Sequence, residues 1–193
     1  IPNEPLIFVE VALSNNMPES IKEVIKIDRS VTLDQDINTA IFYSISNCQE
    51  GLSGISFGNF LIKNVAHQLK QEIEGLNRFA TLSPAPGFTK WLKENSIDQN
   101  IQEDILLKQA LAYLIDSDRA DVFPSDTVAK FHLGNGAIVD DIVVNANISE
   151  TGFKRSYGVM VNYLYELKNI EKNHEEYMNK NKVIVSDKIK KCL

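Results

Sequence analysis

A loop with two glycines is the first place where this sequence could bind a reactive ligand. It contains Ser53, Gly54, Ile55, Ser56, Phe57, Gly58 and Asn59. It leaves an apolar segment and enters a helix, whose N-terminus carries about half a positive charge and free backbone N–H groups. The loop could therefore hold a phosphate, although it has neither the Walker A pattern nor G-x-G-x-x-G. A flexible connection is an equally good interpretation of the same residues.

Ser83 is a second candidate because it follows the next apolar segment directly, in T-L-S-P-A-P-G-F. In a strand, helix, strand unit both strands end at the same edge of the sheet, where ligands usually bind. This places the Ser83 hydroxyl beside the glycine-containing loop. The alternative is a Ser-Pro pair that only forms a turn. Ser44 lies inside the first of these strands, where a serine usually just satisfies a backbone group.

His132 is the third candidate, in F-H-L-G-N-G-A before a turn with few charges nearby. An imidazole in such a setting can give or take a proton near pH 7. A hydrogen-bonded core histidine explains the residue equally well. His67 and His174 lie in polar helical stretches and are expected on the surface. No second ligand stands at metal-binding spacing from His132, so a metal site is not expected.

The elements that must position these residues alternate between strands and helices. The β-rich apolar segments predict strands over 6–13, 38–46, 77–82, 137–144 and 157–165. Helical spacing predicts helices over 19–26, 88–93, 101–114 and 171–191, and a helix that ends before Gly75 with Ile62, Val65, Leu69 and Ile73 on its apolar face. The fold class is therefore α/β with a mixed central sheet and flanking helices.

The composition fits one globular domain. The chain has 193 residues, of which 44% are hydrophobic, and a formal net charge of −6. The acidic balance argues against nucleic acid as the main partner, and no apolar run is long enough to span a membrane. The two cysteines, Cys48 and Cys192, cannot form a disulfide framework, which suits a reducing compartment.

Five strings in order along the chain resemble malonyl-CoA decarboxylases. They are A-I-F-Y-S-I-S-N-C-Q, G-N-F-L-I-K, A-T-L-S-P-A-P-G-F-T-K-W-L, F-H-L-G-N-G-A and Y-G-V-M-V-N-Y-L-Y. The resemblance runs from about Leu6 to Tyr177. It implies a single catalytic domain over 1–193 with the fold of the GNAT superfamily of N-acetyltransferases, without the family's helical N-terminal domain.

The resemblance also implies an activity and a site. The expected reaction converts malonyl-CoA to acetyl-CoA and CO2 without a cofactor or metal, through an enolate protonated by a Ser/His pair. Ser83 and His132 match the family's active-site serine and histidine, Ser53 to Asn59 its malonyl-CoA binding loop, and Ser44 and Tyr165 other pocket residues. The expected partners are malonyl-CoA and acetyl-CoA, with no nucleic acid or membrane. The full-length family protein is expected to be a homo-oligomer, in the cytoplasm, mitochondrial matrix or peroxisome.

Two departures from the family are visible. Ser56 stands where members commonly have a glutamate, and the connection between Trp91 and Phe131 is shorter than in animal members. Two other functions stay open. An acyltransferase of the same fold would use the same CoA loop but needs an acceptor pocket, and a non-catalytic CoA-binding module would need neither Ser83 nor His132.

Overall fold

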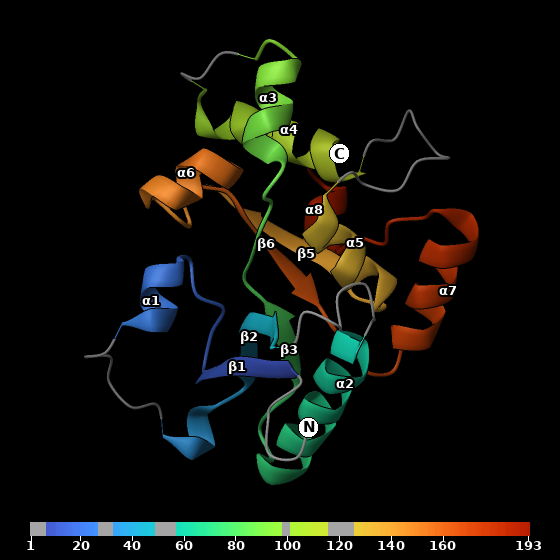
Figure 1. The fold of residues 1–193 in the computed structure, drawn as a ribbon. Coiled ribbons are helices and arrows are strands. Elements are labelled where there is room, and N and C mark those ends of the chain that lie inside the picture. Colours follow the sequence, from blue (N-terminus) through green and yellow to red (C-terminus); the bar gives the residue numbers. More distant parts are fainter. Residues whose placement is uncertain (1–6, 27–32, 49–56, 98–100, 116–125) are drawn as a thin grey trace. The chain divides into compact units, whose positions relative to one another are not determined.

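The computed structural model describes residues 7–26, 33–48, 57–97, 101–115 and 126–193 (Figure 1). The chain forms two compact units, residues 1–17 with 27–80 and residues 18–26 with 81–193. The expectation of one catalytic domain over 1–193 stays a prediction. Among the described residues, no helix has the length and apolar character that crossing a bilayer requires.

The first unit is built on three neighbouring strands. β1 (Ile7–Ser14) and β2 (Thr39–Asn47) pair antiparallel, with a register irregularity between Glu10 and Val11. A short 3-10 helix, Asp34–Asp36, precedes β2, and α2 (Phe57–Glu72) leads from β2 to β3 (Arg78–Thr81), which neighbours β2 in the sheet. Apolar residues of β2, α2 and β3 are fully buried: Ala40, Ile41, Phe42, Ile62, Ala66, Phe79 and Ala80.

The second unit holds the remaining strands. β6 (Met160–Leu164) pairs antiparallel with β4 (Ser83–Pro84) and with β5 (Ile138–Val143). Its helices are α1 (Ile21–Ile25), α3 (Phe88–Glu94), α4 (Glu103–Ile115), α5 (Thr127–Gly134), α6 (Glu150–Ser156), α7 (Ile170–Lys180) and α8 (Asp187–Lys190).

The predicted fold class, α/β with a mixed sheet and flanking helices, is confirmed. Two helices, α5 and α6, were not predicted. The strand predicted over 157–165 begins only at Met160, because Tyr157 and Gly158 have φ values of 51° and 77° at the end of α6. The segment predicted as helical over 171–191 contains two helices, α7 and α8, rather than one.

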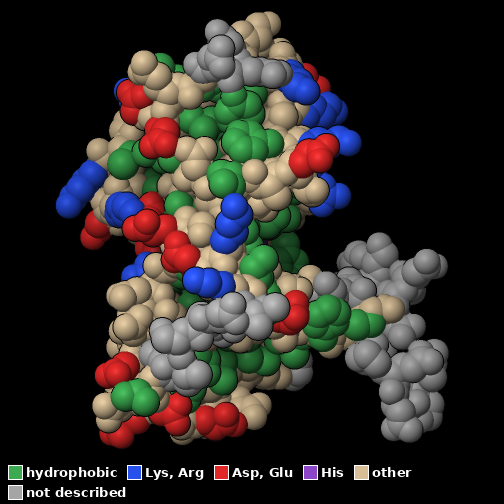
Figure 2. All heavy atoms as spheres, turned by 90° about the vertical axis from the view of Figure 1, so that its left-hand side faces the viewer, with side chains coloured by type: hydrophobic (Ala, Val, Ile, Leu, Met, Phe, Trp, Pro, Cys, Tyr) green, Lys and Arg blue, Asp and Glu red, His purple; other side chains and the backbone are tan. Residues whose placement is uncertain are grey.

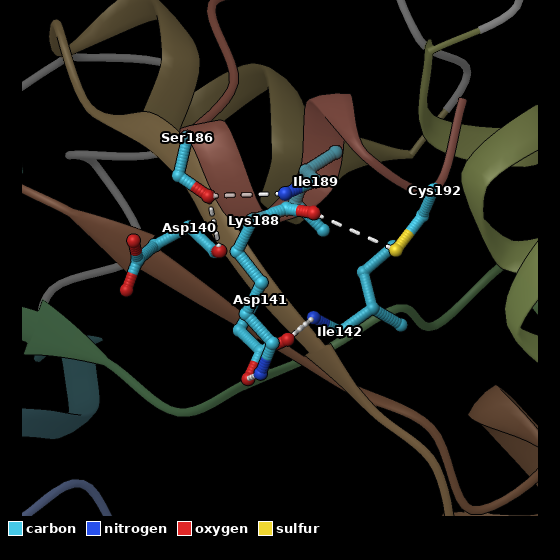
Figure 3. A network of polar contacts seen from close by, with 7 residues as sticks. All are labelled: Asp140, Asp141, Ile142, Ser186, Lys188, Ile189 and Cys192. Carbon is cyan, nitrogen blue, oxygen red and sulfur yellow. Dashed lines mark hydrogen bonds and ion pairs between the residues drawn. The ribbon is translucent and has the colours of Figure 1, made fainter.

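A polar network attaches α8 to β5 (Figure 3). Val139 donates its N–H to the Ile184 carbonyl and accepts the N–H of Ser186, each at 2.9 Å. The Ser186 hydroxyl donates to the Asp140 carbonyl at 2.7 Å and caps α8 by accepting the Ile189 N–H at 3.3 Å. Lys188 forms an ion pair with Asp141. The segment before α8 therefore lies along β5 as a parallel bridge.

Charged side chains of both signs are interspersed over the face drawn in Figure 2. This mixture agrees with a composition of 20 Lys and Arg against 26 Asp and Glu. It is typical of a solvated surface. The partner predictions based on charge stay predictions.

Candidate active site

Ser83 lies on one face of the second unit together with Thr81 and two tyrosines. Ser83 Oγ lies 2.9 Å from Thr81 Oγ1, and Tyr163 and Tyr165 both contact the imidazole of His132, so the four side chains gather on one side. Ser83 pairs with Val161 on β6. The tyrosine backbone is linked to the serine segment because the Tyr163 N–H donates to Thr81 Oγ1 at 3.3 Å.

His132 comes to this face from the last turn of α5. Its Nε2 lies 3.0 Å from Ser83 Oγ, although the two residues are 49 positions apart in the chain. Its Nδ1 lies 2.8 Å from the Tyr165 hydroxyl. The Tyr163 ring stacks on the imidazole, with a centroid distance of 4.6 Å and 25° between the planes. Ser83, His132 and Tyr165, all three predicted as site residues, are thus joined in one hydrogen-bonded network.

This hydrogen-bonded network is almost closed to solvent, since Ser83 is 6% exposed, His132 3% and Tyr165 2%. Burial disfavours the charged imidazolium and lowers the pKa of His132 to about 3. Burial likewise raises the pKa of Tyr165 well above its ordinary value. The structure therefore differs from the expectation of an imidazole that titrates near pH 7: His132 is a neutral ring with one N–H to give and one nitrogen to accept.

This burial predicts how stability depends on pH. The unfolded imidazole has a pKa of about 6.5, whereas the folded one has a pKa of about 3. Between these values the unfolded state binds a proton that the folded state does not. The contribution of His132 to the free energy of unfolding therefore falls with decreasing pH, by up to about 1.4 kcal/mol per unit, and its slope fades to zero as pH rises through about 6.5.

His132→Gln should remove this contribution, so its unfolding free energy should vary less with pH than that of the wild type. Urea unfolding of both proteins at several values between about pH 4.5 and 7.5 measures the difference. Parallel curves for the two proteins would contradict the buried, neutral state of His132.

Asp126 fixes the beginning of α5 and hence the place of His132. The carboxylate is 2% exposed. Its Oδ1 accepts the N–H groups of Val128 and Ala129, each at 2.9 Å, as an N-cap. Its Oδ2 accepts the Tyr113 hydroxyl at 2.9 Å and the Gly87 N–H at 3.4 Å. One side chain therefore connects α5 with α4 and with the segment that follows Ser83.

We expect Asp126→Ala to lower the free energy of unfolding by about 2 kcal/mol, because it removes a cap and leaves buried donors unpaired. Ser149→Ala is the matched control, since the Ser149 hydroxyl caps α6 with one bond to the Gly152 N–H at 3.0 Å. That variant should lose about 1 kcal/mol. Chemical denaturation compares the two. An equal or smaller loss for Asp126→Ala would show that the Oδ2 contacts contribute nothing.

Two side chains of α7 fix the other end of α5. His174 Nδ1 lies 2.6 Å from the carbonyl oxygen of Gly134, the last residue of α5. Asn173 Nδ2 donates to the Gly136 carbonyl at 3.3 Å. The expectation that His174 is a solvated surface residue is therefore wrong, because its ring is half-buried against α5. His67 on α2 is exposed, as expected.

The other predicted site residues lie outside this chain of contacts or outside the described residues. Ser44 is half-buried on β2 of the first unit, opposite Glu10 on β1. Ser53 to Ser56 lie outside the described residues, and residues 57–59 are described only as the start of α2. The described part of the chain holds no group of three or more His, Cys, Asp or Glu that could bind a metal ion.

Thr81 and Tyr163 belong to the site but were not named from the sequence. Each stands two residues before a named one, Thr81 before Ser83 and Tyr163 before Tyr165. The period-2 alternation of a strand was the signal that could have found them. What it could not show is that α5 crosses this face, since α5 was not predicted.

The comparisons with known proteins agree over the whole chain. The model of the malonyl-CoA decarboxylase C-terminal domain matches residues 1–103 and 93–193. Malonyl-CoA decarboxylase, mitochondrial, of Anser anser anser is 31% identical over 236 aligned residues, covering 98% of this chain and 47% of that protein. The Mus musculus protein of the same name is 32% identical over 235, covering 97% and 48%. The chain spans about half the length of these curated relatives.

Two solved structures show the same fold. The crystal structure of malonyl-CoA decarboxylase from Rhodopseudomonas palustris has a TM-score of 0.87 at 39% identity, covering 97% of this chain and 49% of that one. The one from Cupriavidus metallidurans has a TM-score of 0.83 at 35% identity, covering 100% and 56%. With the family model matched from residue 1 to residue 193, the chain belongs to the malonyl-CoA decarboxylase family, in its C-terminal domain.

Proposed function

We propose that this chain catalyses the decarboxylation of malonyl-CoA to acetyl-CoA and CO2. The observation that carries the proposal is the contact of 3.0 Å between Ser83 Oγ and His132 Nε2 on a buried face. It occurs in a chain of the family whose solved and curated members are named malonyl-CoA decarboxylases. Neither an acyltransferase nor a CoA-binding module is favoured by a specific contact.

The reaction needs one bond broken and one proton delivered. The bond between the malonyl α-carbon and its carboxylate breaks, CO2 leaves, and the electron pair becomes an enolate on the thioester. The α-carbon then takes a proton to give the acetyl group. The thioester itself accepts the electrons, so the protein's task is to stabilise the enolate oxygen and to supply the proton. A positioned acid contributes about 10²–10⁴-fold to such a step.

We assign the proton delivery to Ser83 and His132. Ser83 is the outermost residue of the chain of contacts, and its hydroxyl gives a proton to the α-carbon. The serine oxygen regains one from Nε2 of His132, at 3.0 Å. The ring then carries the negative charge left by decarboxylation, and the Tyr165 hydroxyl, 2.8 Å from Nδ1, stabilises it by donating a hydrogen bond while keeping its own proton. One proton from solvent then restores the neutral imidazole of His132 before the next turnover.

The substrate-binding residues follow from the family resemblance. We assign the CoA phosphates to the backbone of the loop from Ser53 to Asn59 and the rest of the pocket to Ser44 and Tyr165. Ser56, which stands in place of the family's glutamate, belongs to the same loop and lies outside the described residues.

Incubation of the chain with malonyl-CoA, with acetyl-CoA and CO2 followed together, tests the proposal. A decarboxylase forms both in equal amounts without an acceptor. Release of free CoA only when an amine is added would instead identify an acyltransferase. Binding of malonyl-CoA without any product would identify a binding module.

A further inference from the structure

Thr81 is buried beside the Ser83–His132 contact, and its hydroxyl contacts Ser83 rather than the imidazole. Its side chain is fully buried. Ser83 Oγ lies 2.9 Å from Thr81 Oγ1, within reach to donate to it, and Oγ1 accepts the Tyr163 N–H at 3.3 Å. That backbone bond holds Oγ1 in place from β6, the strand that also carries the two tyrosines around His132.

A count of protons shows what this contact decides. Each hydroxyl has one proton to donate, and a neutral imidazole has one N–H and one bare nitrogen. If Ser83 donates to Thr81, its contact with His132 has to be made by an Nε2–H of the ring. Nδ1 is then bare, and Tyr165 donates to it.

The opposite direction of the Ser83–His132 hydrogen bond would give the serine a different role. If Ser83 donated to Nε2, the ring proton would sit on Nδ1 and Tyr165 would accept it. Ser83 would then face a general base, the arrangement of a nucleophilic serine in acyl transfer. The direction of these hydrogen bonds thus distinguishes a serine that passes on a proton from a serine that attacks a substrate carbonyl as a nucleophile.

We propose that Thr81 is a positioning residue, which accepts the Ser83 proton in the free enzyme and thereby holds His132 as the Nε2–H tautomer. The acceptor is present before substrate arrives, so the ring already carries the proton that Ser83 needs. Its consequence for turnover rests on the proposed decarboxylation. The tautomer itself does not, since it is a property of the substrate-free protein.

Nitrogen-15 NMR of the imidazoles in the complete chain measures the tautomer directly. The His132 signals are identified as those missing from His132→Gln. We expect a protonated Nε2 and a bare Nδ1 in the wild type. Thr81→Val keeps the branched shape but removes the acceptor, so Ser83 should turn to Nε2 and the ring proton should move to Nδ1. Thr81→Ser keeps the hydroxyl and should keep the wild-type tautomer.

The kinetic expectation follows the same order. Thr81→Val should lower kcat about tenfold with KM changed less than about twofold, the size of one hydrogen bond lost from the reacting arrangement. Thr81→Ser should restore most of kcat. Thr89→Val is the matched control, because Thr89 is a similarly buried threonine whose hydroxyl donates to the Phe153 carbonyl at 2.9 Å, and it should leave the tautomer and kcat unchanged.

A wild-type ring protonated on Nδ1 would overturn the proposal, and so would a folded Thr81→Val with the wild-type tautomer. The first of these results would overturn it even if Thr81→Val does not fold. A chain with the expected tautomers but no acetyl-CoA formation would refute the proposed function and leave the role of Thr81 standing.

Discussion

Turnover of malonyl-CoA should fall at least about 100-fold in His132→Ala and in Ser83→Ala, with binding of acetyl-CoA nearly unchanged. The two side chains meet at 3.0 Å and form the route by which the proposed proton passes from the ring to the substrate. Their effect therefore falls on the transition state and much less on the bound ground state. Steady-state kinetics and calorimetry with acetyl-CoA measure the two parts.

His67→Ala is the control for these variants. His67 is exposed on α2 and should be replaceable without loss of turnover. The double variant Ser83→Ala with His132→Ala should lose little more than either single variant, because residues that act as a unit are not additive. Near-native turnover in either single variant would make that residue structural and remove it from the mechanism.

Gly136→Ala, in the turn after α5, should lower the free energy of unfolding by about 3–5 kcal/mol. Gly136 has a φ of +80°, which side chains rarely adopt. A Cβ at this position would overlap the carbonyl group of Ile170, at the start of α7. The substitution would therefore strain the backbone and push α7 away from the turn that follows His132.

Gly134→Ala is a close control, two residues away in the same segment. Among the residues that the structure describes, a Cβ there would meet the Tyr177 ring alone, at an ordinary 3.9 Å. We expect a change in unfolding free energy within about 1 kcal/mol, since alanine is favoured over glycine in a helix. Chemical denaturation measures both variants. Similar losses at 134 and 136 would show that the turn adapts and that neither the φ value nor the Ile170 contact matters.

The longer strands and most helices could be predicted from this sequence, the strands from their β-rich apolar segments and the helices from the spacing of their apolar residues, whereas β4 (Ser83–Pro84) was not predicted. α5 could not be predicted, because F-H-L-G was interpreted as the approach to a turn. Its N-terminal signal was present in Asp126, whose carboxylate caps the helix. α6 was missed for a different reason. It contains Gly152, and glycine is unfavourable inside a helix. The glycine is needed there because a Cβ would overlap the Asn147 carbonyl.

The site was predictable only in part. Ser83 and His132 were named from their places in the sequence as well as from the family resemblance, Tyr165 from the resemblance alone, and the two-residue spacing from Tyr165 could have added Tyr163. The neutral state of His132 could not be read from its neighbours in the chain. It depends on stacking against Tyr163 and on burial by residues far away in the sequence. Long-range packing decides such properties, and local composition does not report it.

The bridge from Val139 to the segment before α8 also affects how copies of the protein meet in solution. A strand with free N–H and C=O groups along its edge offers a template to other chains and is a common start of aggregation. In β5 the N–H and C=O of Val139 are already bonded to Ile184 and Ser186. If this segment detached, an apolar strand containing Ile138 and Val139 would be open to strand pairing between molecules. The short stretch before α8 thus covers the edge of β5 at Val139 as well as fixing α8.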